Sequence, residues 1–194
     1  IDAYVWLHRG AYACATDLAL GRPTTRFITY AMHRIRMLQH YGVKPYVVFD
    51  GAQLPSKAGT ERERAARRRE HRMRGLQFHA EKRTSAARDA FVRSVDITPA
   101  LAYELIKQLR VHGIPYLVAP YEADAQLAYL ERHGIIDAII TEDSDLLVFG
   151  CNKVLFKLDT YGNCLEIDRA RFDKVKQLSF EGWTHQEFRQ MAIL

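Results

Sequence analysis

Short apolar runs that end in acidic residues restrict the fold of this chain more than any other feature. Residues 46–50 are rich in β-branched and aromatic side chains, and the run ends at Asp50. Similar runs span 116–119 and 137–141, and the last of these is followed by further acids. Such runs predict buried strands, each of which ends close to a carboxylate.

Helical patterns separate these runs. Apolar residues recur at helical spacing between 24 and 41. The segment 98–112 opens with Thr-Pro, Pro120 predicts the start of another helix, and 184–187 has the pattern of a capping box. Residues 154–167 predict a hairpin. Strands that alternate with helices predict an α/β fold with a mainly parallel central sheet flanked by helices.

Carboxylates gather at the ends of the predicted strands. In a parallel sheet these ends share one edge, where ligand sites lie. Such a group of acids repels itself unless hard cations neutralise it, and oxygen ligands suit Mg²⁺ or Mn²⁺. Two such ions about 4 Å apart can activate water and stabilise a leaving oxygen in phosphodiester hydrolysis. The six candidates are Asp2, Asp50, Glu122, Asp124, Asp143 and Asp145.

Each of these acids also has a structural interpretation. A helix dipole favours acids in its first turn, which covers Glu122 and Asp124. Asp50 precedes a glycine, as is common in turns. Asp143 or Asp145 is a reasonable helix N-cap. The placement of all six at successive strand ends nevertheless favours a metal-binding role.

The positive charge is concentrated in one segment. Residues 57–93 contain 12 Lys and Arg and 5 Asp and Glu, which gives +7, whereas the rest of the chain carries 16 and 18. Arginine dominates 61–74 and suits bidentate contact with phosphate. Few large apolar residues lie here, so we expect an exposed, mobile and partly helical segment. Glu–Arg pairs within a solvated helix are the structural alternative, but the excess charge favours a polyanionic partner.

Other features narrow the class of protein. The three cysteines Cys14, Cys151 and Cys164 form neither a zinc pattern nor a disulfide framework, which fits a reducing, intracellular setting. No apolar run approaches the ~18 residues of a membrane span, so no membrane is expected as a partner. The chain starts without Met and ends in a helical pattern, so we treat it as a fragment of a longer protein.

Several segments resemble the structure-specific 5′ nucleases of the flap endonuclease and xeroderma-pigmentosum-G type, and together they run over nearly the whole chain. They are residues 2–8, 47–51, 54–57, 119–130 and 140–147. The blocks 119–130 and 140–147 are long and specific. Asp124 and residues 149–151 favour the exonuclease branch of this family, because the flap endonucleases usually carry Glu at the position of Asp124.

The resemblance implies one PIN-like nuclease domain over 1–194, truncated at both ends, with 57–93 forming a basic helical arch. The family's glycine-rich start, a later metal-binding Asp and a helix-hairpin DNA clamp would lie outside this chain. We therefore expect the fragment alone to bind metal weakly and to cut poorly.

The resemblance also implies roles for individual residues. Two Mg²⁺ ions, with Mn²⁺ as a substitute, would be held by the six acids, with Asp50 and Asp145 acting in catalysis. Lys57 and Arg64 would contact the scissile phosphate. The remaining residues expected to contact DNA are Tyr4, His8, Arg67 and Arg68.

The implied function is that of a two-metal 5′→3′ double-stranded DNA exonuclease with 5′-flap endonuclease activity. Its partners would be DNA with 5′ ends, nicks or flaps, and its setting mismatch repair and recombination in the nucleus. Mismatch-repair proteins would bind through regions outside this chain. The alternatives are a flap endonuclease acting mainly in replication, a ribonuclease with a similar acidic crevice, and a non-catalytic nucleic-acid-binding module.

Overall fold

The computed structural model describes residues 1–175 and 180–193. The chain divides into two compact units. The first, here called the sheet unit, comprises Ile1–Asp2, Met37–Gly51 and Tyr116–Leu194. The second, the helical unit, comprises Ala3–Arg36 and Ala52–Pro115. Residues 176–179 and 194 of the domain predicted over 1–194 lie outside the described residues.

The sheet unit contains short strands of the kind that the apolar runs predict. β1 (Val47–Phe49) pairs in parallel with β2 (Tyr116–Val118). β3 (Ile139–Ile140) pairs in parallel with β4 (Lys153–Phe156), and β5 (Leu165–Asp168) returns antiparallel to β4 as the predicted hairpin. The predicted α/β fold with a mainly parallel sheet is confirmed.

The first two residues connect these two small sheets. Asp2 forms a parallel bridge with Val48, and the Val48 amide donates to the Ile1 carbonyl oxygen at 2.9 Å. On the other side, the Asp2 amide donates to the Ile140 carbonyl oxygen at 3.1 Å. The segment Ile1–Asp2 therefore lies between β1 and β3 in the manner of a strand.

Three α-helices follow the strands of the sheet unit: α7 (Ala123–Arg132), α8 (Asp145–Val148) and α9 (His185–Ile193), with the 3-10 helix η2 (Arg169–Lys174) before α9. The prediction that a helix opens at Pro120 is wrong. The Gly51 amide donates to the Tyr121 carbonyl oxygen at 2.6 Å, and Glu122 has an extended backbone, so α7 begins only at Ala123. The predicted capping box is confirmed, because Thr184 Oγ1 accepts from the Glu187 amide at 3.2 Å and the Glu187 carboxylate accepts from the Thr184 amide at 2.7 Å.

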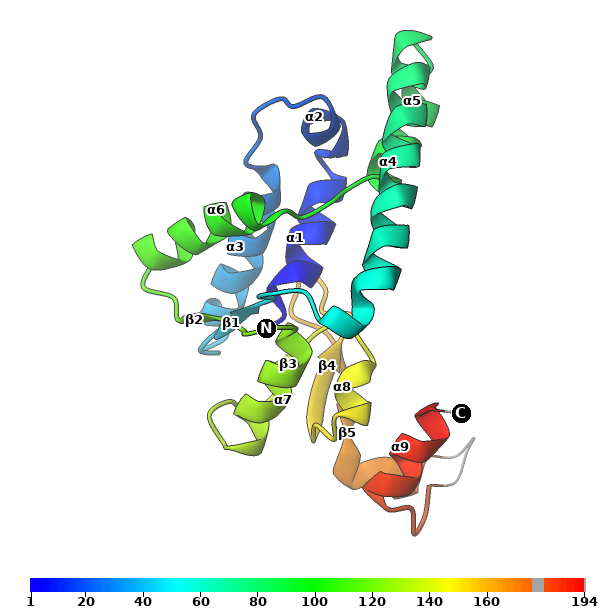
Figure 1. The fold of residues 1–194 in the computed structure, drawn as a ribbon. Coiled ribbons are helices and arrows are strands. Elements are labelled where there is room, and N and C mark those ends of the chain that lie inside the picture. The colour runs from blue at the N-terminus through cyan, green and yellow to red at the C-terminus, as the bar shows by residue number, and fades with distance from the viewer. Residues whose placement is uncertain (176–179, 194) are drawn as a thin grey trace. The chain divides into compact units, whose positions relative to one another are not determined.

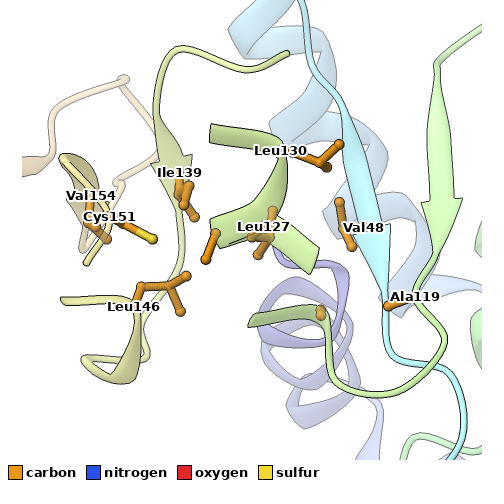
Figure 2. Packing of buried hydrophobic residues seen from close by; sticks show 10 residues of the cluster. Val48, Ala119, Leu127, Leu130, Ile139, Leu146, Cys151 and Val154 are labelled. Carbon is orange, nitrogen blue, oxygen red and sulfur yellow. The ribbon is translucent and has the colours of Figure 1, made fainter. Parts of the chain in front are cut away.

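The core of the sheet unit forms where α7 covers the strands. Figure 2 shows Leu127 of α7 between Val48 of β1 and Ile139 of β3. All three side chains are fully buried. Burial of a side chain of this size contributes roughly 1.5–3 kcal/mol, so this cluster fixes the strand ends relative to α7. The buried cluster consists of Val48, Ala119, Ala123, Leu127, Ala128, Leu130, Ile139, Leu146, Cys151 and Val154.

The helical unit is built from helices alone in its described residues. They are α1 (Ala3–Tyr12), α2 (Ala15–Ala19), α3 (Arg26–His40, whose last four residues belong to the sheet unit), η1 (Pro55–Lys57), α4 (Ala58–Ala80), α5 (Thr84–Arg93) and α6 (Pro99–Val111). Thr98 Oγ1 accepts from the Leu101 amide at 3.4 Å, which confirms the predicted cap of α6. Gly10 allows α1 to cross α3 closely, since a Cβ there would lie 2.7 Å from the Phe27 backbone.

The basic segment is more regular than predicted. Instead of a partly helical stretch, α4 is one continuous helix of 23 residues, and α5 lies beside it (Figure 1). Arg, Glu and Ala are strong helix formers, so the helix needs little burial. Gly75 is its one buried residue, and a Cβ there would lie 2.5 Å from the Phe91 ring of α5. Across 1–175 and 180–193, no helix is both long enough and apolar enough to cross a membrane.

Candidate metal centre

All six predicted acids belong to the sheet unit, where they occupy the ends of strands and the starts of helices. Asp2 lies in the segment between β1 and β3, Asp50 follows β1, Glu122 and Asp124 begin α7, Asp143 follows β3, and Asp145 is the first residue of α8. Asp2 is buried, Asp50, Glu122 and Asp124 are half-buried, and Asp143 and Asp145 are exposed. The acids thus range from the sheet interior to its open edge.

The electrostatics of Asp124 show that five of the acids are neighbours. Burial is the largest cause that raises the pKa of the Asp124 carboxyl, which reaches about 7. The negative charges of Asp2, Asp143, Asp50 and Glu122 raise this pKa further, in that order. Charges act on a pKa in this way only from close range. The structure therefore brings together acids from four separate segments of the chain.

Hydrogen bonds link the same edge through a residue that the sequence did not single out. The buried Thr141 hydroxyl donates to Asp2 Oδ2 at 3.3 Å, and its Oγ1 accepts from the Asp143 amide at 3.1 Å. Asp143 Oδ1 in turn accepts from the Asp145 amide at 2.9 Å. Asp145 is not among the charges that raise the Asp124 pKa, but this series of hydrogen bonds connects it to the other acids. The placement of Thr141 at the end of a predicted strand was the available signal, but its side-chain contact depends on a residue far away in sequence.

Asp50 has a structural role as well as a place in the acidic group. Its Oδ1 accepts from the Ala123 amide at 2.7 Å, so it supplies the cap of α7 from a different segment. Glu122, at the N-cap position itself, makes no side-chain cap bond. Gly51 is required beside it, because a Cβ there would lie 1.8 Å from the Ala119 carbonyl oxygen. Asp50 and α7 are thereby held together.

The donor chemistry of this site fits a hard divalent cation. All six side chains offer oxygen ligands, the type that Mg²⁺ and Mn²⁺ take. A divalent cation would also cancel the repulsion that helps to raise the Asp124 pKa. Within residues 1–175 and 180–193, however, no three His, Cys, Asp or Glu side chains are arranged so that they could hold a metal ion. The acids lie within electrostatic range of one another rather than within coordination distance.

The predicted phosphate contacts lie in the helical unit. Lys57 is exposed at the end of η1. Arg64 pairs with Glu61 at 2.8 Å, which is the helix ion pair expected as the structural alternative, although at a spacing of three residues. Arg68 lies 3.4 Å from Asp96 and 3.8 Å from Glu61. Arg67 is exposed on the same helix.

Tyr4 and His8 are both half-buried on α1, while Trp6 between them packs into the core. Burial lowers the pKa of His8, the charge of Asp96 raises it, and the charge of Arg68 lowers it. Two residues predicted to contact DNA, His8 and Arg68, are thus close neighbours. Asp96, which acts on both residues, was not predictable as their common neighbour, because it lies far from both along the chain.

Comparisons with known proteins identify the class to which this fold and acidic edge belong. Residues 1–71 match the family model of the XPG N-terminal domain, and residues 113–194 match that of the XPG I-region. The chain therefore belongs to the XPG family of nucleases.

Two similar curated proteins are named as exonucleases, in agreement with the exonuclease branch of the family. Exonuclease 1 of Xenopus laevis is 50% identical over the whole chain, which spans 26% of that protein. Exodeoxyribonuclease 1 of Schizosaccharomyces pombe is also 50% identical and is spanned to 34%. The chain thus covers about a quarter to a third of the length of these relatives.

Solved structures share the fold. The catalytic core of Rad2 in complex with DNA substrate is 27% identical, with a TM-score of 0.64 over 93% of this chain and 50% of that one. The Holliday junction-resolving enzyme GEN1 in complex with product DNA and Mg²⁺ is 22% identical, with a TM-score of 0.54 over 93% and 35%. The second likeness bears on the fold alone.

Proposed function

We propose that this chain is the catalytic part of a metal-dependent 5′→3′ exonuclease on double-stranded DNA that also cuts 5′ flaps. The carrying observation is the acidic edge of the sheet unit, where four neighbouring carboxylates help to raise the Asp124 pKa to about 7. A carboxyl group whose pKa is raised this far by burial and by neighbouring charges is typical of a functional site. Sequence identity of 50% to proteins named as exonucleases supports the same reaction.

The six acids would hold two Mg²⁺ ions, and Mn²⁺ could replace them. When bound, these ions supply an activated water and charge stabilisation for the leaving oxygen. Asp50 and Asp145 would orient the reacting groups, and the Thr141 hydroxyl would fix the position of Asp2. The contact between Asp50 and the Ala123 amide keeps the start of α7, and hence Glu122 and Asp124, at the same edge.

The helical unit would supply the contacts to DNA. Lys57 and Arg64 would bind the scissile phosphate, with Arg67 and Arg68 on neighbouring phosphates of the same strand. Guanidinium groups bind phosphate through paired hydrogen bonds, which favours arginine here. Tyr4 and His8, with their half-buried rings, would stack on the DNA end.

The substrates would be DNA with 5′ ends, nicks or flaps, and the cellular setting mismatch repair and recombination in the nucleus. Mismatch-repair proteins would bind segments that lie outside this chain. A DNA damage-inducible protein of Saccharomyces cerevisiae is 40% identical, which supports a role in the response to DNA damage.

The test follows Mg²⁺-dependent degradation of a duplex with a recessed 5′ end by the full-length protein and its Asp145→Asn variant. Asn keeps the shape of the side chain and removes its charge. We expect short 5′ products from the wild type, a loss of at least about 10³-fold in the variant, and a DNA affinity that is not reduced. Equal cleavage by both proteins would make Asp145 structural. Binding without metal-dependent cleavage by the wild type would instead favour a nucleic-acid-binding module.

A further inference from the structure

A basic pocket lies beside one of the candidate metal ligands. It is an open cavity of about 560 Å³ within the sheet unit. The residues that line it come from the end of α7, from α8 and the residue after it, and from α9. They include Arg132, Asp145, Val148, Phe149, His185 and Arg189.

Backbone contacts hold the walls of this pocket in place. Arg132 Nη2 donates to the Phe149 carbonyl oxygen at 3.3 Å. His185 Nε2 donates to the Val148 carbonyl oxygen at 3.1 Å, which ties α9 to the end of α8. Gly150 has φ +86° and lies so close to this contact that a Cβ would sit 2.8 Å from His185 Nε2. The turn after Asp145 and the helix that carries Arg189 are therefore fixed to one another.

The charge of the pocket favours an anion. With neutral histidine, its two arginines exceed the one carboxylate of Asp145. Within the part of the chain that the structure describes, neither Arg132 nor Arg189 has a carboxylate oxygen within 4.0 Å. Both are exposed, so their guanidinium donors are accessible to a ligand. Planar guanidinium groups match the oxygen pairs of a phosphate.

We propose that Arg132 and Arg189 bind a backbone phosphodiester of the DNA substrate other than the one that is cut. The inference rests on the proposed function, because it assigns this pocket to the same bound strand that the acidic edge would cleave. Asp145 belongs to both places, so a phosphate in the pocket sets the register of the strand at the candidate metal centre. The pocket is a positioning site and takes no part in bond breaking.

The test measures DNA binding without cleavage, using the full-length protein with Ca²⁺ in place of Mg²⁺. Fluorescence anisotropy of a labelled duplex with a recessed 5′ end gives the dissociation constant across a salt series. The logarithm of the binding constant falls as the logarithm of the salt concentration rises. Each lost phosphate contact makes this slope less steep by about 0.9. We expect this change, with a several-fold loss of affinity, for Arg189→Gln and for Arg132→Gln. Arg171→Gln is the matched control, because Arg171 is exposed, pairs with Asp168 and does not line the pocket.

A second measurement locates the phosphate. Substrates in which one phosphate at a time is an uncharged methylphosphonate are compared between wild type and Arg189→Gln. We expect one position, away from the cleavage point, at which the methylphosphonate weakens DNA binding by the wild type. At that position the methylphosphonate should leave DNA binding by Arg189→Gln unchanged. Arg189→Lys, which keeps the charge, is expected to retain the salt slope. Denaturation midpoints equal to wild type show that the Gln variants are folded.

The proposal fails if the Arg189→Gln and Arg171→Gln proteins share the same salt slope, or if no single methylphosphonate loses its effect. Calorimetric titration with inorganic phosphate separates the sources of the anion. Tight phosphate binding that Arg189→Gln abolishes, with an unchanged DNA slope, would make the pocket a small-anion site and overturn the proposal. The Asp145→Asn cleavage assay tests the proposed function independently, because the binding experiment needs no turnover.

Discussion

The sheet unit and the helical unit handle charge in opposite ways. In the sheet unit, acids from four segments meet at one edge, and the Asp124 pKa rises to about 7 because burial, and then the neighbouring like charges, disfavour ionisation. In the helical unit, Arg64 and Arg68 of α4 lie beside Glu61 and Asp96, so opposite charges compensate one another. The first arrangement stores electrostatic repulsion, and the second relaxes it.

This contrast shows which charges are held by the fold itself. Asp2 accepts a hydrogen bond from the Thr141 hydroxyl, and Asp50 accepts one from the Ala123 amide. These contacts join the ends of paired strands and the start of α7, so the fold fixes the positions of both acids. Arg64 and Arg68, by contrast, lie on a mostly exposed helix and contact the side chains of Glu61 and Asp96. Rigid, uncompensated charge is suited to holding a cation, whereas adaptable charge is suited to following a flexible polyanion.

Asp2→Asn is expected to have the largest effect. It removes one negative charge from the acidic edge without changing the shape of the side chain. We expect the cleavage rate of the full-length protein to fall by about 10³-fold, or about 4 kcal/mol in activation free energy. Asp17→Asn, an acidic residue of α2 in the helical unit, is the matched control and should leave the rate within a factor of about 2, as for other surface changes. Equal losses in both variants would show that total charge, not the acidic edge, controls cleavage.

Gly51→Ala tests how tightly the acidic edge is built. The new Cβ would lie 1.8 Å from the Ala119 carbonyl oxygen, so the backbone after β1 must move. We expect the free energy of unfolding in urea to fall by about 3 kcal/mol. Gly59→Ala in α4 is the control, since a Cβ there meets nothing within 4 Å, and it should stabilise the protein by about 0.5 kcal/mol. Equal stability of the two variants would show that the backbone after β1 is no more tightly packed than the exposed start of α4.

Asp124→Asn is expected to increase stability while it removes a candidate metal ligand. The pKa of Asp124 is higher in the folded protein, at about 7, than its ordinary 3.8, so the folded state holds the proton more tightly. This group therefore makes the protein less stable as the pH rises from about 4 through 7, and the full penalty is present above pH 7. After allowance for solvent screening, we expect Asp124→Asn to raise the metal-free unfolding free energy at pH 8 by about 1 kcal/mol. The gain should vanish near pH 4, and added Mg²⁺ should stabilise only the wild type.

A pair of α4 variants is expected to show the smallest effect. Arg67→Gln should lower the salt slope of DNA binding by about 0.9 and weaken binding a few-fold, because its guanidinium is exposed. Arg68→Gln should change DNA binding less and lower stability by about 0.5 kcal/mol, since Arg68 lies beside Glu61 and Asp96. Anisotropy and urea denaturation measure the two effects. Identical behaviour of the two variants would remove the distinction between paired and exposed arginines.

The sequence predicted the elements better than the contacts between them. Runs of β-branched residues located the strands, and the Thr98 and Thr184 caps located α6 and α9, because these signals are local. The start of α7 was misplaced, since the pairing of residue 121 with residue 51 outweighs the helix signal of Pro120. The continuous α4 was underestimated because its stability comes from intrinsic helix propensity rather than from burial.

The candidate site shows the same division. The spacing of acids after strands was enough to predict that they would share one edge, and the pKa of Asp124 agrees with this. The role of Asp50 as the cap of α7 and the link through Thr141 were not predictable. Both depend on contacts between segments that are distant in sequence, which a local pattern does not encode.

The hydrogen bond between Asp2 and Thr141 also has a consequence for the order of synthesis. It joins residues 139 positions apart, so the acidic edge needs the first and a late part of this chain at once. At ribosomal rates of roughly 5–20 residues per second, Asp50 waits on the order of ten seconds for Asp143 to be made. During that interval the early carboxylates lack Glu122, Asp124 and Asp143 as neighbours. The full group of acids that raises the Asp124 pKa assembles only when the later strands arrive.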